Sequence, residues 1–150
     1  MTTTVSLEEL PSLVGKDLGF TDYREITQEQ VNTFADATDD HQWIHTDPEK
    51  AKDGPFGGPI AHGYLSLSLT IPFWTELLDV SGVSTKVNYG LNKARFPSPV
   101  KVGSKIRMGA TIANVEEIAG GAQITVDCAV EIGGQTKPAV VLQAVHRFYA

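Results

Sequence analysis

Residues 39–48 concentrate acidic and imidazole side chains, with three carboxylates and two histidines in ten residues. Asp40 and His45 are the pair with the clearest chemical potential. A histidine has an ordinary pKa of about 6.5, and a nearby carboxylate can orient the ring or share a water molecule with it. The pair therefore predicts general acid–base chemistry. Trp43 and Ile44 lie between the two residues, and we expect them to anchor the segment to the core.

Two other interpretations use the same residues. A bare D-x4-H spacing is by itself more typical of a solvated loop that follows a helix. A metal site with mixed nitrogen and oxygen ligands could also be built from Asp39, His41, His45 and Asp47. Their spacing matches no metal-binding pattern, so we expect no metal.

His62 and Gly63 form a second candidate, at the start of the longest apolar run in the chain. Glycine has no Cβ, so the backbone N–H of Gly63 could approach a ligand closely. The free N–H groups and the dipole of a helix N-terminus stabilise an oxyanion. The alternative is a glycine that is needed only for packing.

Helices are expected on both sides of these residues. Thr27 and Gln30 form a capping-box pattern, which predicts a helix of about three turns that ends at residues 39–40. Asp47 and Pro48 predict a second, short helix. Residues 60–78 are apolar on nearly every side, which predicts a long buried helix that bends near Pro72. Residues 5–14 are weakly amphipathic and predict a short or broken helix.

The remainder of the chain favours strands. Residues 16–25 predict a first strand, and the period-two pattern after Gly82 predicts five more, at residues 83–89, 93–96, 105–118, 122–132 and 137–148. Glycine pairs at 120–121 and 133–134 predict hairpin turns. The fold class is therefore α+β, with an antiparallel β-sheet wrapped around a long central hydrophobic α-helix. Such a sheet leaves one side of the helix open, which predicts a homodimer.

Size and composition restrict the function. A chain of 150 residues fits a single domain over residues 1–150, and its 41% hydrophobic content is ordinary for a globular protein. A net charge of −6 without a basic cluster argues against nucleic-acid binding. Cys128 is the only cysteine, so no disulfide framework is expected. The N-terminus lacks a secretory pattern and residues 60–78 are too polar for a bilayer, so we expect no membrane and a cytoplasmic location.

The two candidate segments carry a resemblance to a known family. The sequence D-x-Q-W-I-H (residues 40–45), followed by G-G-P-I-A-H-G-Y-L (residues 57–65), is similar to the MaoC-like (R)-specific enoyl-CoA hydratases, which have a hotdog fold. The resemblance covers essentially the whole chain, including R-F-P-S-P-V at residues 95–100. The W-I-H variant looks closest to a nodulation-protein-N-like branch of single-domain hydratases. Asp39, Gln42 and Trp43 stand where the family motif has glycine, asparagine and proline.

The resemblance implies an activity and three catalytic positions. Asp40 and His45 would hold and activate one water molecule, which adds to a trans-2-enoyl-CoA thioester to give an (R)-3-hydroxyacyl-CoA. The N–H of Gly63 would stabilise the enolate oxygen. Because a shared water couples the two titrations, the family pattern leaves open which of Asp40 and His45 is the base.

The resemblance also implies a substrate-binding set and no cofactor, since coenzyme A is part of the substrate. The acyl chain would lie in a tunnel lined by aromatic and apolar side chains, with further contacts from two polar neighbours of the catalytic residues, and cations would bind the CoA phosphates. The expected residues are Trp43, Phe56, Tyr64 and Leu65 for the tunnel, Gln42 and His62 for the polar contacts, and Lys93, Arg95 and Lys101 for the phosphates.

Two other functions remain open from the sequence. A hotdog acyl-CoA thioesterase would hydrolyse the same kind of substrate, usually with a lone carboxylate on or near the central helix, where this chain offers only Glu76. A non-catalytic acyl-CoA-binding module would keep the fold without the chemistry.

Overall fold

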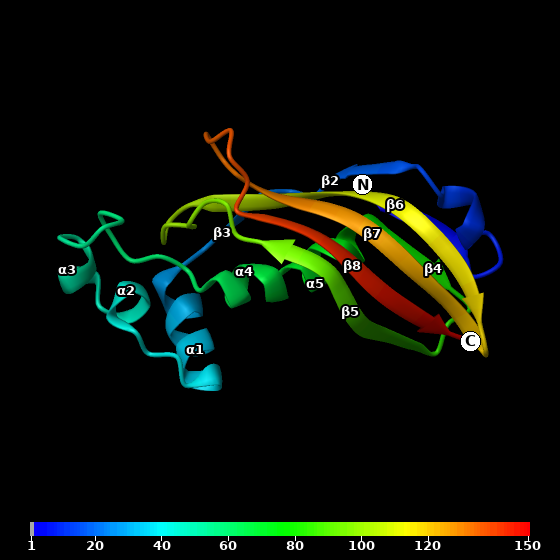
Figure 1. The fold of residues 1–150 in the computed structure, drawn as a ribbon, viewed down its shortest axis with the longest axis horizontal. Helices are drawn as coiled ribbons and strands as arrows, with labels where there is room; N and C mark the ends of the chain where they lie inside the picture. Colours follow the sequence, from blue (N-terminus) through cyan, green and yellow to red (C-terminus); the bar gives the residue numbers. More distant parts are fainter. Residues whose placement is uncertain (1) are drawn as a thin grey trace.

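The computed structural model describes residues 2–150 and shows a curved sheet with helices along its concave side (Figure 1). The strands are β1 (Thr3–Ser6), β2 (Asp17–Phe20), β3 (Arg24–Glu25), β4 (Leu78–Ser81), β5 (Thr85–Arg95), β6 (Lys105–Ile118), β7 (Gly121–Ile132) and β8 (Val140–Tyr149). The helices are η1 (a 3-10 turn, Leu10–Leu13), α1 (Gln28–Thr38), α2 (Trp43–Thr46), α3 (Pro48–Ala51), α4 (Gly63–Ser68) and α5 (Thr70–Leu77).

The main sheet has six strands. Five of them follow the order β2-β6-β7-β8-β5, and β3 also pairs with β6. The long strands β6, β7 and β8 are antiparallel neighbours, as expected for a meander. Gly120 has a φ of +79° in the turn between β6 and β7, a left-handed conformation that glycine adopts without a steric penalty. The expected glycine turns and the α+β class are confirmed.

The core lies between the concave face of the sheet and α5. Alternate residues of β7, including Ile124, Val126 and Val130, are fully buried, because successive strand side chains point to opposite faces. Phe73 and Leu77 of α5 belong to the same hydrophobic cluster and are also buried. This arrangement, a sheet wrapped around a hydrophobic helix, is the expected hotdog architecture.

The central helix is interrupted. It was expected to run from residue 60 to residue 78 with a bend near Pro72, but it consists of α4 and α5 separated at Leu69. The break is consistent with Pro72, because proline lacks the N–H that would bond to the carbonyl of Ser68 one turn earlier. The helix also begins later than expected, since Ile60 forms a β-bridge with Lys101.

Three expectations about local structure differ from what the structure shows. Of the short or broken helix expected over residues 5–14, only η1 is present, because residues 3–6 form β1, which pairs in parallel with β4. The helix expected to reach residue 78 ends at Leu77 for the same reason. The strands expected at 83–89 and 93–96 are one strand, β5, whose register against β8 shifts around Gly90 and Asn92. These irregularities interrupt the alternation that marks a strand in the sequence.

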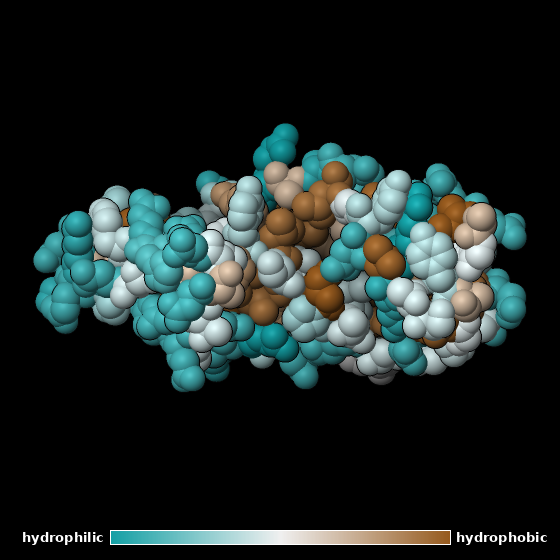
Figure 2. All heavy atoms as spheres, turned by 90° about the horizontal axis from the view of Figure 1, so that it is seen from below, coloured by the Kyte–Doolittle hydropathy of each residue, from teal (hydrophilic) through white to brown (hydrophobic). Residues whose placement is uncertain are grey.

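One side of the molecule is left open. Strand β5 forms an edge of the sheet and is exposed along almost its whole length, and Leu67 and Ile71 of the central helix are only half-buried. Figure 2 views the molecule from the lower side of Figure 1 and shows apolar surface along its middle, between polar ends. The helix is therefore not covered on all sides within residues 2–150. None of the helices described is long and apolar enough to cross a bilayer.

Candidate active site

Asp40 follows the sharp turn that ends α1. The helix begins with Thr27, whose hydroxyl accepts a hydrogen bond from the Gln30 N–H at 3.1 Å, and it ends at Asp39, which has a left-handed φ of +62°. Aspartate tolerates this conformation better than most residues. The turn brings the Asp40 main chain close to the start of α4, where its carbonyl accepts a hydrogen bond from His62 Nε2 at 2.9 Å.

His45 lies on the single turn of α2 with only 7% of its surface exposed. Its Nδ1 is 2.7 Å from the carbonyl oxygen of Ile60. A carbonyl can only accept, so Nδ1 carries the proton in the neutral ring and Nε2 carries a lone pair. The amide of Gln28 donates to the main-chain carbonyl of His45 at 2.8 Å and ties α2 to α1. His45 is therefore held with Nε2 available as a base.

The surroundings lower the pKa of His45. Burial is the main cause, and the neighbouring His62 acts in the same direction, whereas the hydrogen bond to Ile60 and the Asp40 carboxylate partly oppose it. A lowered pKa means that the ring stays neutral at pH 7 and remains competent to accept a proton.

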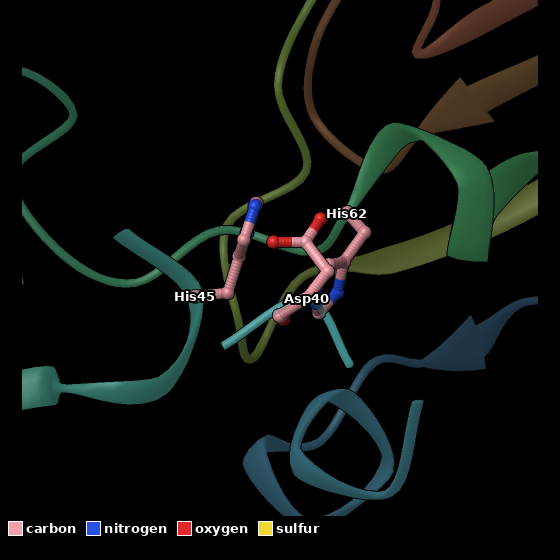
Figure 3. Close-up of side chains that lie close together, drawn as sticks. All are labelled: Asp40, His45 and His62. Carbon is pink, nitrogen blue, oxygen red and sulfur yellow. The ribbon is translucent and has the colours of Figure 1, made fainter. Parts of the chain in front are cut away.

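Asp40, His45 and His62 gather in front of the N-terminus of α4 (Figure 3). The two imidazole rings are stacked, with centroids 3.9 Å apart and an angle of 22° between their planes. His62 is 3% exposed, and the Phe34 ring lies beside the His62 ring, with 4.9 Å between the two ring centroids. Nδ1 of His62 is buried and has no hydrogen-bond partner within residues 2–150.

Gly63 is the first residue of α4, directly after His62. The main-chain N–H groups of Gly63 and Tyr64 find no acceptor among residues 2–150, as is usual for the first turn of a helix. A Cβ on Gly63 would lie 3.3 Å from three atoms of the Phe96 ring. The glycine thus presents a free N–H and leaves room for Phe96, so both interpretations offered by the sequence have a structural basis.

Two adjoining cavities meet at these residues. The first, of about 410 Å³, contains both members of the acid–base pair and is lined by Phe34, Thr38, Asp40, His45, His62, Gly63, Tyr64 and Phe96. The second has a volume of about 350 Å³ and shares His45, Gly63 and Phe96 with the first. Its other lining residues are mainly apolar and include Phe56 and Val100. A water-activating pair thus borders a space with the character of an acyl-chain site.

The other expected substrate-binding residues lie outside the first cavity. Leu65 lines a groove on the far side of Phe34. Trp43 packs beside Gly54, with Lys50 4.7 Å above its ring, so it anchors the α2–α3 segment instead of facing Asp40.

Gln42 and the two cations of β5 are on the surface, whereas His62, the other expected polar contact, is buried in the first cavity. Gln42 precedes α2 as its N-cap, and its carbonyl accepts the N–H of His45 at 3.0 Å. Lys93 and Arg95 are exposed on β5, and Arg95 bonds to the carbonyl of Ala94.

Among the residues weighed as a metal site, Asp39 and His41 lie 3.4 Å apart at the surface, whereas His45 is buried. His41 points outward and pairs with Asp36 at 3.0 Å, a hydrogen bond that raises the pKa of His41, and Asp47 caps α3. Within residues 2–150, ligand-type atoms of Asp40, His45 and His62 do lie within 4.8 Å of one another. One nitrogen of each ring is already bonded to a main-chain carbonyl, Nδ1 of His45 to Ile60 and Nε2 of His62 to Asp40, so each ring has a single nitrogen left that could bind a metal.

Reasoning from the sequence missed several cavity residues, among them Phe34, Phe96 and Ser66. Phe34 lies in the expected helix that begins at Thr27, and Phe96 at the end of an expected strand, but neither was assigned to the site. Ser66 lines the second cavity one turn after Gly63, is 3% exposed, and makes no side-chain hydrogen bond within residues 2–150. The sequence signal for Ser66 was a hydroxyl side chain three positions after Gly63, which lies at the start of the expected helix.

The fold agrees with comparisons to known proteins. The family model described as MaoC like domain matches residues 9–132. The chain belongs to the MaoC-like family. A 3-hydroxyacyl-thioester dehydratase Z of Mycobacterium tuberculosis (strain ATCC 25618 / H37Rv) is 47% identical over 151 residues, which cover 100% of both chains. Nodulation protein N of Rhizobium leguminosarum bv. viciae is 39% identical over 91% of this MaoC-like chain and 86% of its own.

A solved structure supports the same assignment. The (R)-hydratase from A. caviae involved in PHA biosynthesis superposes with a TM-score of 0.73 at 25% identity, over 89% of this chain and 94% of the other. The hotdog fold expected from the sequence is confirmed, and so is the resemblance to MaoC-like proteins of the nodulation-protein-N type. The chain is a hydro-lyase, an enzyme that adds or removes water.

Proposed function

We propose that this MaoC-like chain is an (R)-specific enoyl-CoA hydratase that adds water to trans-2-enoyl-CoA and catalyses the reverse dehydration of (R)-3-hydroxyacyl-CoA. The observation that carries the proposal is the buried His45, fixed by Ile60 with a free Nε2 in the same cavity as Asp40 and Gly63. The relatives named for hydroxyacyl-thioester dehydration and (R)-hydration support this choice of substrate and stereochemistry.

The proposed reaction uses one water and returns all its atoms to the product. The water oxygen bonds to C3 of the enoyl thioester while a water proton passes to Nε2 of His45, the lone pair left free by the Ile60 contact. The C2=C3 electrons shift toward the thioester carbonyl, whose oxygen accepts a hydrogen bond from the free N–H of Gly63. A proton from the Asp40–His45 pair then reaches C2, and the enolate collapses to the thioester.

Asp40 serves two purposes in this scheme. Its carboxylate accepts a hydrogen bond from the same water, and its negative charge stabilises the imidazolium that forms when His45 takes the proton. The second purpose is consistent with the upward effect of Asp40 on the pKa of His45. No cofactor takes part, because thioester activation and proton transfer are supplied by the substrate and the protein.

The substrate would lie across the two cavities. The acyl chain fits the apolar second cavity beside Phe56, and the pantetheine arm leaves past Tyr64, which is 70% exposed at the mouth of the first. The CoA phosphates would meet exposed cations, with Lys93 and Arg95 of β5 as the candidates.

We also propose that the functional form is a homodimer. The exposed edge of β5, with Tyr89 56% and Leu91 46% exposed, adjoins half-buried apolar side chains of the central helix. An unpaired, apolar strand edge is a template for association, and a second copy would cover it with two-fold symmetry.

The thioesterase alternative finds no support at the central helix. Glu76 lies near the end of α5, and Gly63 lies at the other end of the interrupted central helix, at the start of α4. One carboxylate oxygen of Glu76 accepts a hydrogen bond from the N–H of Asp22 at 3.0 Å. The Glu76 carboxylate is therefore hydrogen-bonded at a place outside the cavity that contains Asp40.

Crotonyl-CoA tests the proposal directly. Hydration removes the enoyl-thioester absorbance without releasing thiol, hydrolysis releases thiol, and a binding module does neither. Coupling the product to an (R)- or an (S)-specific 3-hydroxyacyl dehydrogenase reads its configuration. Release of thiol, or a product accepted only by the (S)-specific enzyme, would contradict the proposal.

A further inference from the structure

We propose that His62 is a positioning residue of the hydration site: it anchors the main chain of Asp40 through Nε2–H and fixes the plane of the His45 ring by stacking. This inference rests on the proposed function. It also differs from the expectation that His62 contacts substrate, because its one bonded nitrogen is committed to Asp40.

The hydrogen bond to Asp40 is the first support. The Asp40 side chain forms no hydrogen bond or ion pair within residues 2–150, although it must meet a water beside His45. The position of the Asp40 side chain therefore depends on the Asp40 main chain. That main chain follows Asp39, which has a left-handed conformation, and its carbonyl oxygen accepts a hydrogen bond from His62 Nε2 at 2.9 Å. Because His62 is 3% exposed, this bond is shielded from competing water.

The stacked ring is the second support. The Ile60 carbonyl fixes Nδ1 of His45, but a single hydrogen bond leaves the ring free to tilt about that contact. The His62 ring lies against it at 3.9 Å with 22° between the planes, which restricts the tilt and keeps Nε2 directed at the cavity. His62 is also the N-cap of α4, directly before Gly63, so the same residue links the stacked ring to the Gly63 N–H.

The unpaired nitrogen indicates why a histidine occupies this position. The Asp40 carbonyl can only accept, so Nε2 of His62 carries the proton and Nδ1 is a bare acceptor. That acceptor is buried without a donor among residues 2–150, which is unfavourable. A phenylalanine would supply the ring without the donor, and a glutamine would supply the donor without the ring. Histidine is retained because it provides both.

These two substitutions form the test, with crotonyl-CoA as substrate. His62→Phe keeps a ring against His45 and removes the donor to Asp40, so we expect kcat to fall by ~10²-fold, the scale of a misplaced catalytic group, while KM changes little. His62→Gln restores an N–H donor and recovers part of the lost kcat. Crystal structures of both variants report the position of Asp40, which is displaced in His62→Phe and restored in His62→Gln.

His146→Phe is the matched control. His146 is also buried, at 7% exposed, and stacks on an aromatic ring, that of Trp74 at 5.4 Å, but it lies outside the first cavity. We expect His146→Phe to change the melting temperature of the protein as much as His62→Phe does. We expect the kcat of His146→Phe to stay at the wild-type value. Turnover is normalised to folded protein in every variant.

The outcomes are distinguishable. A wild-type chain without hydration activity overturns the proposed function and the role of His62 with it. An active wild type whose His62→Phe and His62→Gln variants keep full kcat overturns the role of His62 alone. A raised KM with unchanged kcat also overturns it and returns His62 to substrate binding.

Discussion

Replacing Gly63 with alanine adds one methyl group at the point where the free N–H, Phe96 and the two cavities meet. The new Cβ would lie 3.3 Å from three carbon atoms of the Phe96 ring, below the ~3.5–4.0 Å optimum for carbon contacts. The ring must therefore move by a few tenths of an ångström. Because 43% of the Phe96 surface is exposed, the ring has room to move.

The expected loss of stability is small and the expected loss of activity is large. Overpacking at a half-exposed ring falls at the low end of the usual range, ~1 kcal/mol. For a chain of this size that corresponds to a melting temperature lower by about 2–4 °C. The thioester oxygen, by contrast, would lose its approach to the Gly63 N–H, and one oxyanion donor contributes ~3 kcal/mol, or ~10²-fold in kcat.

Melting temperature and crotonyl-CoA hydration should be measured on the same Gly63→Ala preparation. The methyl could also act indirectly, because Phe96 lines both cavities. Phe96→Leu in the Gly63→Ala background separates the two effects, since the smaller side chain removes the crowding and leaves the methyl near the N–H. Activity that returns in the double variant attributes the loss to Phe96. A lower melting temperature with unchanged kcat in Gly63→Ala refutes the oxyanion assignment.

Three further predictions follow from the site and the fold. Asp40→Asn and His45→Gln should each lower kcat at least ~10²-fold with the fold retained, measured by crotonyl-CoA hydration and circular dichroism, and near-wild-type turnover would remove that residue from the mechanism. Light scattering should show a dimer at micromolar concentration and a shift toward monomer for Leu91→Lys on the β5 edge, whereas an active wild-type monomer would contradict the dimer. Burial lowers the pKa of His146 to about 4, so below pH 6.5 the unfolded chain binds a proton that the folded chain does not. The free energy of unfolding should therefore fall between pH 6.5 and pH 4, by at most ~3 kcal/mol. Urea unfolding should show a shallower pH dependence for His146→Phe than for the wild type.

The sequence was a good guide to features that depend on neighbouring residues. The α1 cap at Thr27, the helix end at Asp39 and the glycine turns all depend on local backbone preferences, and all are present. Asp40 and His45 could be paired from their spacing because the segment between them is short. Five residues of extended chain can span about 17 Å, and here the single turn of α2 shortens the segment so that both residues line one cavity.

Features that depend on distant contacts were not predictable in the same way. The pairing of Thr3 with Leu78 turned a weakly helical N-terminus into a strand and ended the central helix. The break at Leu69 could be anticipated from Pro72. The sequence placed His62 and Gly63 near the helix start but extended the helix back to residue 60, because the β-bridge between Ile60 and Lys101 joins segments that are remote in sequence.

The cavity shows the same division. Its titratable residues come from motifs that point to chemistry, whereas the two rings that enclose them, Phe34 and Phe96, come from a helix and a loop whose sequence patterns indicated only secondary structure or family resemblance. Trp43 was assigned to the substrate tunnel by the family resemblance. A residue on one helical turn can face away from its neighbours, and Trp43 instead packs beside Gly54.

Two backbone carbonyls bear on a point that the residue types alone left open, which residue takes the proton from water. The Ile60 carbonyl holds the proton of His45 on Nδ1 and leaves a lone pair on Nε2, whereas His62 is bonded through Nε2 to the Asp40 carbonyl and its Nδ1 is buried. In the hydration direction the water proton therefore has an imidazole acceptor already oriented toward it. The imidazolium that would result keeps its bond to Ile60 and is stabilised by the negative charge of the Asp40 carboxylate, which acts to raise the pKa of His45. On this reasoning His45 is the base of the hydration step, and Asp40→Asn should impair it by removing the charge that stabilises the imidazolium.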